Sequence, residues 1–87
     1  MKYKRVPGIV ITQFCGKYFL VTQKETLKIS ETAFLCLKRL EQDADIYDLC
    51  QVIEDQFEID NERALVTDVQ NLINDLLARR LLMRCTQ

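Results

Sequence analysis

The segment TLKISETA, residues 26–33, marks the one point at which the hydrophobic period of this 87-residue chain changes. Leu27 and Ile29 alternate with polar residues, which is typical of a half-buried strand. Ser30 has the side-chain oxygen that a helix N-cap needs, and beyond it apolar residues recur with helical spacing. We therefore predict strands before Ser30 and helices after it.

The part of the chain before this junction has the pattern of a β-hairpin. Residues that favour strands fill positions 9–14 and 17–22, and Cys15-Gly16 separates the two runs. A two-residue connection with a Gly accommodates the positive φ of a tight hairpin turn. After the polar turn at 23–25, residues 26–29 are expected to form a short third strand, naturally placed at the edge of the sheet.

Three helices are predicted in the rest of the chain. The first runs from Glu31 to about Glu41, the second follows a cap at Asp45, and the third runs from a cap at Asp60 to about Arg80. The fold class is therefore α+β, a three-stranded antiparallel β-sheet followed by three helices in a winged helix-turn-helix-like arrangement. At this length, a single domain over residues 1–87 is expected.

The third predicted helix carries more apolar surface than a helix on one sheet needs. The stripe expected to face the core consists of Leu65, Val69, Leu72 and Leu76. A second stripe, roughly 90° around the helix, consists of Val66, Ile73 and Leu77, with Gln70 within it. The second stripe either packs against the other helices or lines a groove beside the sheet edge, and the pattern leaves both roles open.

The composition points to a binding domain. The 12 Lys and Arg residues balance 13 Asp and Glu residues, so the net charge of −1 argues against a protein that neutralises phosphates. The chain has no His, which excludes Ser-His-Asp triads, Cys-His dyads and His-ligated metals. We expect no enzymatic activity, because no base is visible that would activate Cys15 or Cys85. We also expect no metal site and no cofactor.

The cysteines and the N-terminus fit a cytoplasmic protein. An even count of four permits disulfides, but the chain has no C-x-x-C pair and no secretory signal. Cys36 and Cys50 fall on the apolar faces of predicted helices and are expected to be buried, reduced and inert. The longest apolar run, residues 33–37, is too short to cross a membrane.

Two segments resemble the PqqD-like family, the recognition elements that bind RiPP precursor peptides. Residues 27–33, LKISETA, are similar to the junction between the last strand and the first helix of that family. The family's closing helix signature resembles Asp68-Val69, Leu72-Ile73, Leu76 and Leu81-Leu82. The resemblance extends from about Gly8 to Leu82.

The chain departs from the family pattern at three places. Ser30 stands where the family usually has Asn, and Asp43-Ala44 lies where a Gly is common. Arg80 occupies the position of the usual Gly before the final Leu-Leu. These changes affect helix caps and turns more than the expected groove.

The resemblance implies that the chain binds the leader region of a ribosomally synthesised precursor peptide by strand addition. A separate modifying enzyme or leader peptidase would then receive the peptide. Carried over to this sequence, the hydrogen bonds would come from the main chain of Thr26, Leu27, Lys28 and Ile29. The side-chain groove would consist of Val66, Val69, Gln70, Ile73 and Leu77. Lys28 would either pair with an acidic leader residue or be an exposed charge that discourages edge pairing, and Val69 is equally compatible with the core. Asp68 is more simply explained as a solvated helix residue.

A winged-helix DNA-binding protein is the main alternative, because three helices with a β element also describe that fold. The start of the third helix reads Asn61-Glu62-Arg63, and the basic residues at 2–5 and 79–84 form no patch that would follow a groove of DNA. We therefore expect no nucleic acid and no membrane as partner. An assembly module that docks on a synthase or protease subunit is a third hypothesis, and the free sheet edge also permits a strand-mediated homodimer.

Overall fold

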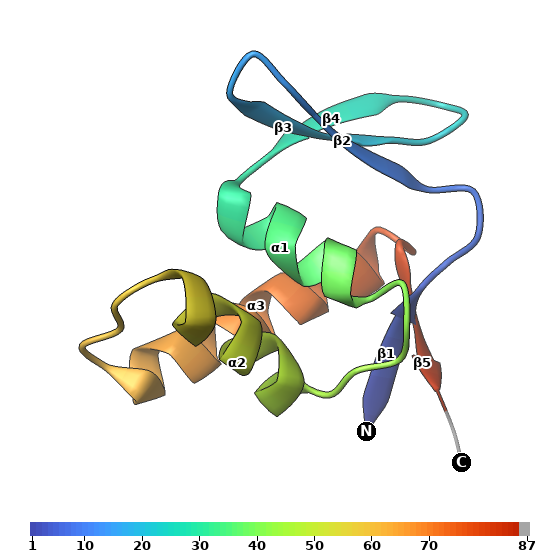
Figure 1. Cartoon of the computed structure of the whole chain (residues 1–87). Helices are drawn as coiled ribbons and strands as arrows, with labels where there is room; N and C mark the ends of the chain where they lie inside the picture. Colours follow the sequence, from blue (N-terminus) through green and yellow to red (C-terminus); the bar gives the residue numbers. More distant parts are fainter. Residues whose placement is uncertain (86–87) are drawn as a thin grey trace.

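The structure, a computed structural model, describes residues 1–85. Within these residues the elements are β1 (Lys2–Arg5), β2 (Val10–Phe14), β3 (Lys17–Val21), β4 (Thr26–Ile29), α1 (Glu31–Arg39), α2 (Ile46–Gln56), α3 (Glu62–Ala78) and β5 (Leu82–Cys85). The strands form two small antiparallel sheets, and the three helices lie below the larger one (Figure 1). The arrangement confirms the predicted α+β class.

The larger sheet has the strand order β2-β3-β4. The predicted hairpin is correct, with Phe14 opposite Lys17 at its tip. Both turn residues have positive φ, 53° at Cys15 and 75° at Gly16, as a two-residue primed turn requires. Gly16 adopts this conformation without strain, whereas Cys15 must accept the less favourable left-handed region. In this order β4 is an edge strand, as predicted.

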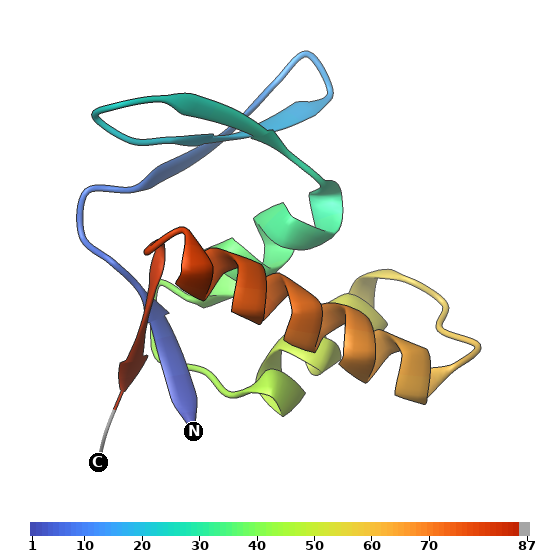
Figure 2. The same cartoon turned by 180° about the vertical axis from the view of Figure 1, so that it is seen from behind.

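The smaller sheet corrects the sequence analysis, which expected no strands at the two ends of the described chain. β1 pairs with β5 from Lys2 opposite Cys85 to Arg5 opposite Leu82. Both strands are short and carry charged residues, so their local patterns gave little sign of them. The sheet exists because the two ends of the chain come together, which Figures 1 and 2 show where β1 and β5 lie side by side.

Side-chain caps begin the three helices. Ser30 Oγ accepts a hydrogen bond from the Ala33 N–H at 3.0 Å, as predicted. Asp45 caps α2 and, with Asp48, forms a reciprocal capping box. The predicted cap at Asp60 is wrong, because the Asn61 side chain accepts the hydrogen bond that caps α3. Asp and Asn cap equally well, so the sequence could not choose between neighbours.

Two helices end earlier than predicted. α1 ends at Arg39 rather than near Glu41, and α3 ends at Ala78 rather than near Arg80. Arg80 has a φ of 62°, and its N–H donates to the Leu77 carbonyl at 3.0 Å. The Leu81 N–H donates to the Leu76 carbonyl at 2.9 Å, which completes a Schellman motif. The left-handed residue of this motif is usually Gly, and here it is an arginine.

The core lies between the larger sheet and the three helices. Its most deeply buried large side chains are Leu20, Leu37, Leu40, Leu49, Val69 and Ile73. Cys36 and Cys50 are both buried and neither is in a disulfide, as their apolar helix faces predicted. Within residues 1–85, no helix combines the length and apolar character that a membrane crossing needs.

Candidate functional site

The outer edge of β4 is open in the part of the chain that the structure describes, because β4 pairs only with β3. The Thr22 N–H donates to the Glu25 carbonyl at 2.9 Å, so Thr22 and Glu25 are the hydrogen-bonded pair that closes the turn between β3 and β4. Since such pairs alternate along antiparallel strands, Leu27 and Ile29 direct their main-chain groups toward β3. Thr26 and Lys28 therefore direct theirs toward the open edge.

A groove of about 220 Å³ lies beside this edge, and we call it the β4–α3 groove. Its wall segments are β4, the start of α1 and the C-terminal half of α3. The lining residues are Leu20, Leu27, Lys28, Ile29, Ser30, Ala33, Leu72, Asp75, Leu76, Arg79 and Leu81. Figure 2 looks onto α3, with the larger sheet above the C-terminal part of the helix.

The β4–α3 groove combines an apolar floor with a charged margin. Leu72 and Leu76, one turn apart on α3, face the side chains of β4 across it. Asp75 and Arg79 lie on the same flank of α3, and the Arg79 Nε donates to Asp75 Oδ2 at 3.2 Å. An apolar floor, unpaired main-chain groups and charges at the margin are together suited to hold an extended peptide.

The junction of β4 and α1 is fixed by Tyr18 on the neighbouring strand. Tyr18 is opposite Ile29 in the sheet, and its hydroxyl donates to Glu31 Oε2 at 2.9 Å. This hydrogen bond, together with partial desolvation and the carboxylate charge, raises the pKa of Tyr18 above its ordinary value. The Tyr18 ring also packs on Phe34, with centroids 4.8 Å apart. These contacts hold the first turn of α1 in place against the end of β4.

Three of the predicted site residues line the groove: Leu27, Lys28 and Ile29. Thr26 lies on the same open edge without lining the groove. Because the main chain of Leu27 and Ile29 is paired with β3, the prediction that all four residues offer main-chain groups to a ligand is corrected to Thr26 and Lys28.

The residues predicted on α3 do not line the β4–α3 groove. Val69 is 1% exposed and Ile73 is 0% exposed, so both belong to the core. Val66, Gln70 and Leu77 are partly buried on the far flank of the helix, well over a quarter turn from Leu72. Of the stripe predicted to face the core, Leu65, Val69 and Leu76 are buried as expected, and Leu72 is partly exposed in the groove. The expectation for the second stripe is wrong at Ile73, which is buried in the core on the side where α2 packs against this helix.

Four residues of α3 and its C-terminal end line the groove although the sequence pattern does not predict them there: Leu72, Asp75, Leu76 and Arg79. The helical spacing assigns Leu72 and Leu76 to the core stripe, and Leu76 is both buried and part of the groove lining. One signal was available: Asp75 and Arg79 are spaced as an i,i+4 ion pair directly beside that stripe. Asp68, from the signature, lies exposed on the same flank one turn or more closer to the N-terminus, outside the groove lining.

The buried thiols add no reactive group to the site. Burial, and less strongly the neighbouring Cys50, raises the pKa of the Cys36 thiol to about 12. Burial, and then the charge of Glu54, also raises the pKa of Cys50. Both thiols are therefore protonated at neutral pH, and the thiolate is the form that reacts.

Two solved structures share the fold of nearly all of this chain. One, described as "TbiB1 in Complex with the TbiA(beta) Leader Peptide", has a TM-score of 0.76 and 13% identity, covering 97% of this chain and 99% of the other. The second, "Lasso peptide synthetase B1 complexed with the leader peptide", has a TM-score of 0.74 and 19% identity, covering 94% of this chain and 98% of the other. At these identities the likeness shows the fold.

The sequence itself is matched at the level of a family. No curated protein sequence matches the chain significantly. The family described as Coenzyme PQQ synthesis protein D (PqqD) matches residues 18–82, which include β4, the three helices and every residue that lines the β4–α3 groove. The resemblance at the strand-to-helix junction and in the closing helix is thereby confirmed, and the chain belongs to the PqqD family.

Proposed function

We propose that this chain binds the leader region of a ribosomally synthesised precursor peptide and presents it to a separate modifying enzyme or leader peptidase. The observation that carries the proposal is the open edge of β4 running beside an apolar groove whose opposite wall is α3. An extended peptide can join such an edge as a further strand and direct alternate side chains into the groove.

The proposed peptide contacts are of two kinds: main-chain hydrogen bonds at the open edge of β4 and side-chain packing in the β4–α3 groove. The N–H and C=O groups of Thr26 and Lys28 hydrogen-bond the main chain of the peptide. Peptide side chains that point to the same face as Leu27 and Ile29 enter the groove and pack on Leu72 and Leu76. The main chain supplies affinity for any extended segment, and the groove selects apolar side chains at alternate positions.

The structural comparisons support the peptide as ligand. Both similar structures are described as complexes with a leader peptide, and each is covered almost completely by this chain. The role proposed is binding without catalysis, and the enzyme that acts on the peptide is a second protein. The same β4 edge can pair with a second copy, so light scattering over a concentration series accompanies each binding measurement.

Fluorescence polarisation tests the proposal, with labelled peptides that tile the small open reading frames beside the gene and a random DNA duplex as control. We expect one leader peptide to bind with a low-micromolar or lower Kd. Leu72→Asp places a charge in the groove and should abolish binding. The matched control is Asn74→Asp, which adds the same charge on the exposed opposite side of α3 and keeps the oxygen that accepts from Gln70.

Each other outcome contradicts the proposal. Binding of the duplex alone would favour the winged-helix alternative. Absence of binding to both probes would exclude leader recognition and favour an assembly module that contacts a folded protein. Equal loss of binding in Leu72→Asp and Asn74→Asp would show that the peptide binds elsewhere.

A further inference from the structure

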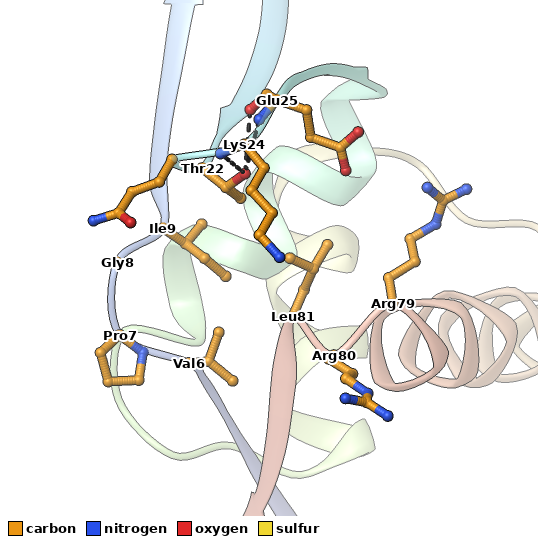
Figure 3. A pocket seen from close by; sticks show the side chains of 11 residues that line it. Val6, Pro7, Gly8, Ile9, Thr22, Lys24, Glu25, Arg79, Arg80 and Leu81 are labelled. Carbon is orange, nitrogen blue, oxygen red and sulfur yellow. Dashed lines mark hydrogen bonds between the residues drawn. The ribbon is translucent and has the colours of Figure 1, made fainter.

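A second cavity, of about 380 Å³, adjoins the β4–α3 groove (Figure 3). Its walls come from three segments: residues 6–9 between β1 and β2, residues 22–25 before β4, and residues 79–81 between α3 and β5. Arg79 and Leu81 line both cavities, so the two meet at these residues. The second cavity lies at the Thr26 end of β4, where an added strand would leave the sheet.

Positive charge predominates in this cavity. Lys24, Arg79 and Arg80 line it together with a single carboxylate, Glu25. Figure 3 shows the Lys24 side chain extending toward Leu81 across the cavity, with Arg79 rising from the end of α3 toward Glu25. Among the described residues, no ion pair within 4.0 Å involves Lys24, Arg80 or Glu25.

Arg79 keeps part of its hydrogen-bonding capacity. Its Nε donates to Asp75, and within residues 1–85 no side-chain hydrogen bond engages its two terminal nitrogens. Terminal guanidinium nitrogens and a lysine ammonium are the donors that a carboxylate pairs with most strongly. Val6, Pro7, Ile9 and Leu81 make up the apolar part of the lining, against which the carbon chain of an acidic residue can pack. A wholly apolar ligand group would leave the cations of the cavity without a partner.

The direction of the sheet indicates which part of a peptide would reach the cavity. Both strand pairs of the larger sheet are antiparallel, and β4 runs from Thr26 to Ile29. A peptide that continues this pattern runs from the Ile29 end to the Thr26 end. Its residues immediately after the paired segment therefore arrive beside Lys24 and Arg79.

We propose that the second cavity is a subsite for an acidic side chain of the bound peptide, located within about three residues C-terminal to the segment paired with β4. Lys24 and the terminal nitrogens of Arg79 bind the carboxylate, and Arg80 adds positive charge at the margin. Glu25 opposes this binding, because it presents a like charge to the ligand. The inference rests on the proposed function and adds a rule for which peptides the chain selects.

The test uses the full chain and a display library of random peptides long enough to cover β4 and the second cavity. The best binder is then synthesised in two forms, with its acidic residues intact or replaced by the corresponding amides. We expect Asp or Glu to be enriched just C-terminal to the apolar segment, and the amide form to bind about three- to tenfold more weakly. Lys24→Gln should remove most of that difference, and Glu25→Gln should tighten binding of the acidic form.

Lys17→Gln is the matched control, because Lys17 lies at the opposite end of the sheet and is exposed. If no library peptide binds the wild-type chain, the proposed function is wrong and the subsite is wrong with it. If peptides bind but acid and amide forms bind equally well, only the subsite is wrong. Enrichment of acidic residues N-terminal to the apolar segment would overturn the antiparallel direction, and an equal effect of Lys17→Gln would show non-specific charge attraction.

Discussion

The Nε atom of Arg79 lies 3.2 Å from Oδ2 of Asp75, and both side chains line the β4–α3 groove one helical turn apart. The two side chains are 53% and 58% exposed, so solvent screens their attraction. The pair therefore contributes little to the stability of the fold. Its position at the margin of the groove bears instead on ligand binding.

Arg79→Ala should separate stability from binding. We expect the free energy of unfolding to change by less than about 0.5 kcal/mol, because the ion pair is exposed. Peptide affinity should fall several-fold, since Arg79 lines both cavities. Urea unfolding and fluorescence polarisation measure the two effects. Arg63→Ala, an exposed change in the first turn of α3, is the control, and an equal loss of affinity there would contradict the assignment.

Leu72 and Ile73 are neighbours in sequence with different expected roles. Ile73→Asp buries a charge in the core, costs more than about 4 kcal/mol and should unfold the protein. Leu72→Asp affects a partly exposed groove residue, so circular dichroism should remain that of the folded chain while peptide binding is lost. If Ile73→Asp is folded but no longer binds the peptide, the peptide contacts the flank of α3 that carries Ile73 and not the flank that carries Leu72.

The open edge of β4 can be tested through one main-chain donor. Lys28→Pro removes an N–H that points away from β3, and edge strands tolerate proline at such a position. We expect the fold to persist and peptide affinity to fall about tenfold, the effect of losing one main-chain hydrogen bond to the ligand. Lys28→Gln controls for the lost charge. Leu27→Pro should instead destabilise the sheet, because the Leu27 N–H points toward β3. Unaltered affinity in Lys28→Pro would exclude strand addition at this edge.

Arg80→Gly should stabilise the fold. Arg80 has a φ of 62° and is the left-handed residue of the Schellman motif that ends α3, where glycine is free of strain. We expect the free energy of unfolding to rise by about 0.5–1 kcal/mol. Thermal unfolding measures this gain. A lower melting temperature would show that the Arg80 side chain makes a stabilising contact that outweighs its backbone cost.

The buried Cys36 thiol should lower the free energy of unfolding at alkaline pH. Burial raises its pKa from 9.0 to about 12, so the folded protein holds the thiol proton more tightly than the unfolded chain does. This stabilisation is complete below pH 9 and is lost as the pH rises from 9 toward 12, by about 1 kcal/mol per pH unit at first. Urea unfolding on both sides of pH 9 measures the slope. Cys36→Ala should reduce it without abolishing it, because the pKa of Cys50 is raised as well. An unchanged slope in Cys36→Ala would assign the loss to other groups.

Several elements of this protein were decided by local chemistry and could be predicted from the sequence. The Cys15-Gly16 turn, the caps at Ser30 and Asp45 and the strand at 26–29 each depend on residues within a few positions of one another. The same is true of the two apolar stripes on α3, which follow from helical geometry alone. The family resemblance was also carried by short local segments, and the match over residues 18–82 confirms it.

The tertiary structure alone decided the β1–β5 sheet and the wall of the groove. β1 and β5 are short, charged strands that meet only when the two ends of the described chain come together, so no local pattern marks them. The rotation of α3 is set by the helix packed against it, which buries Ile73 and leaves Leu72, Asp75 and Arg79 toward β4. Periodicity determines which residues share a face of a helix, whereas packing determines what that face meets.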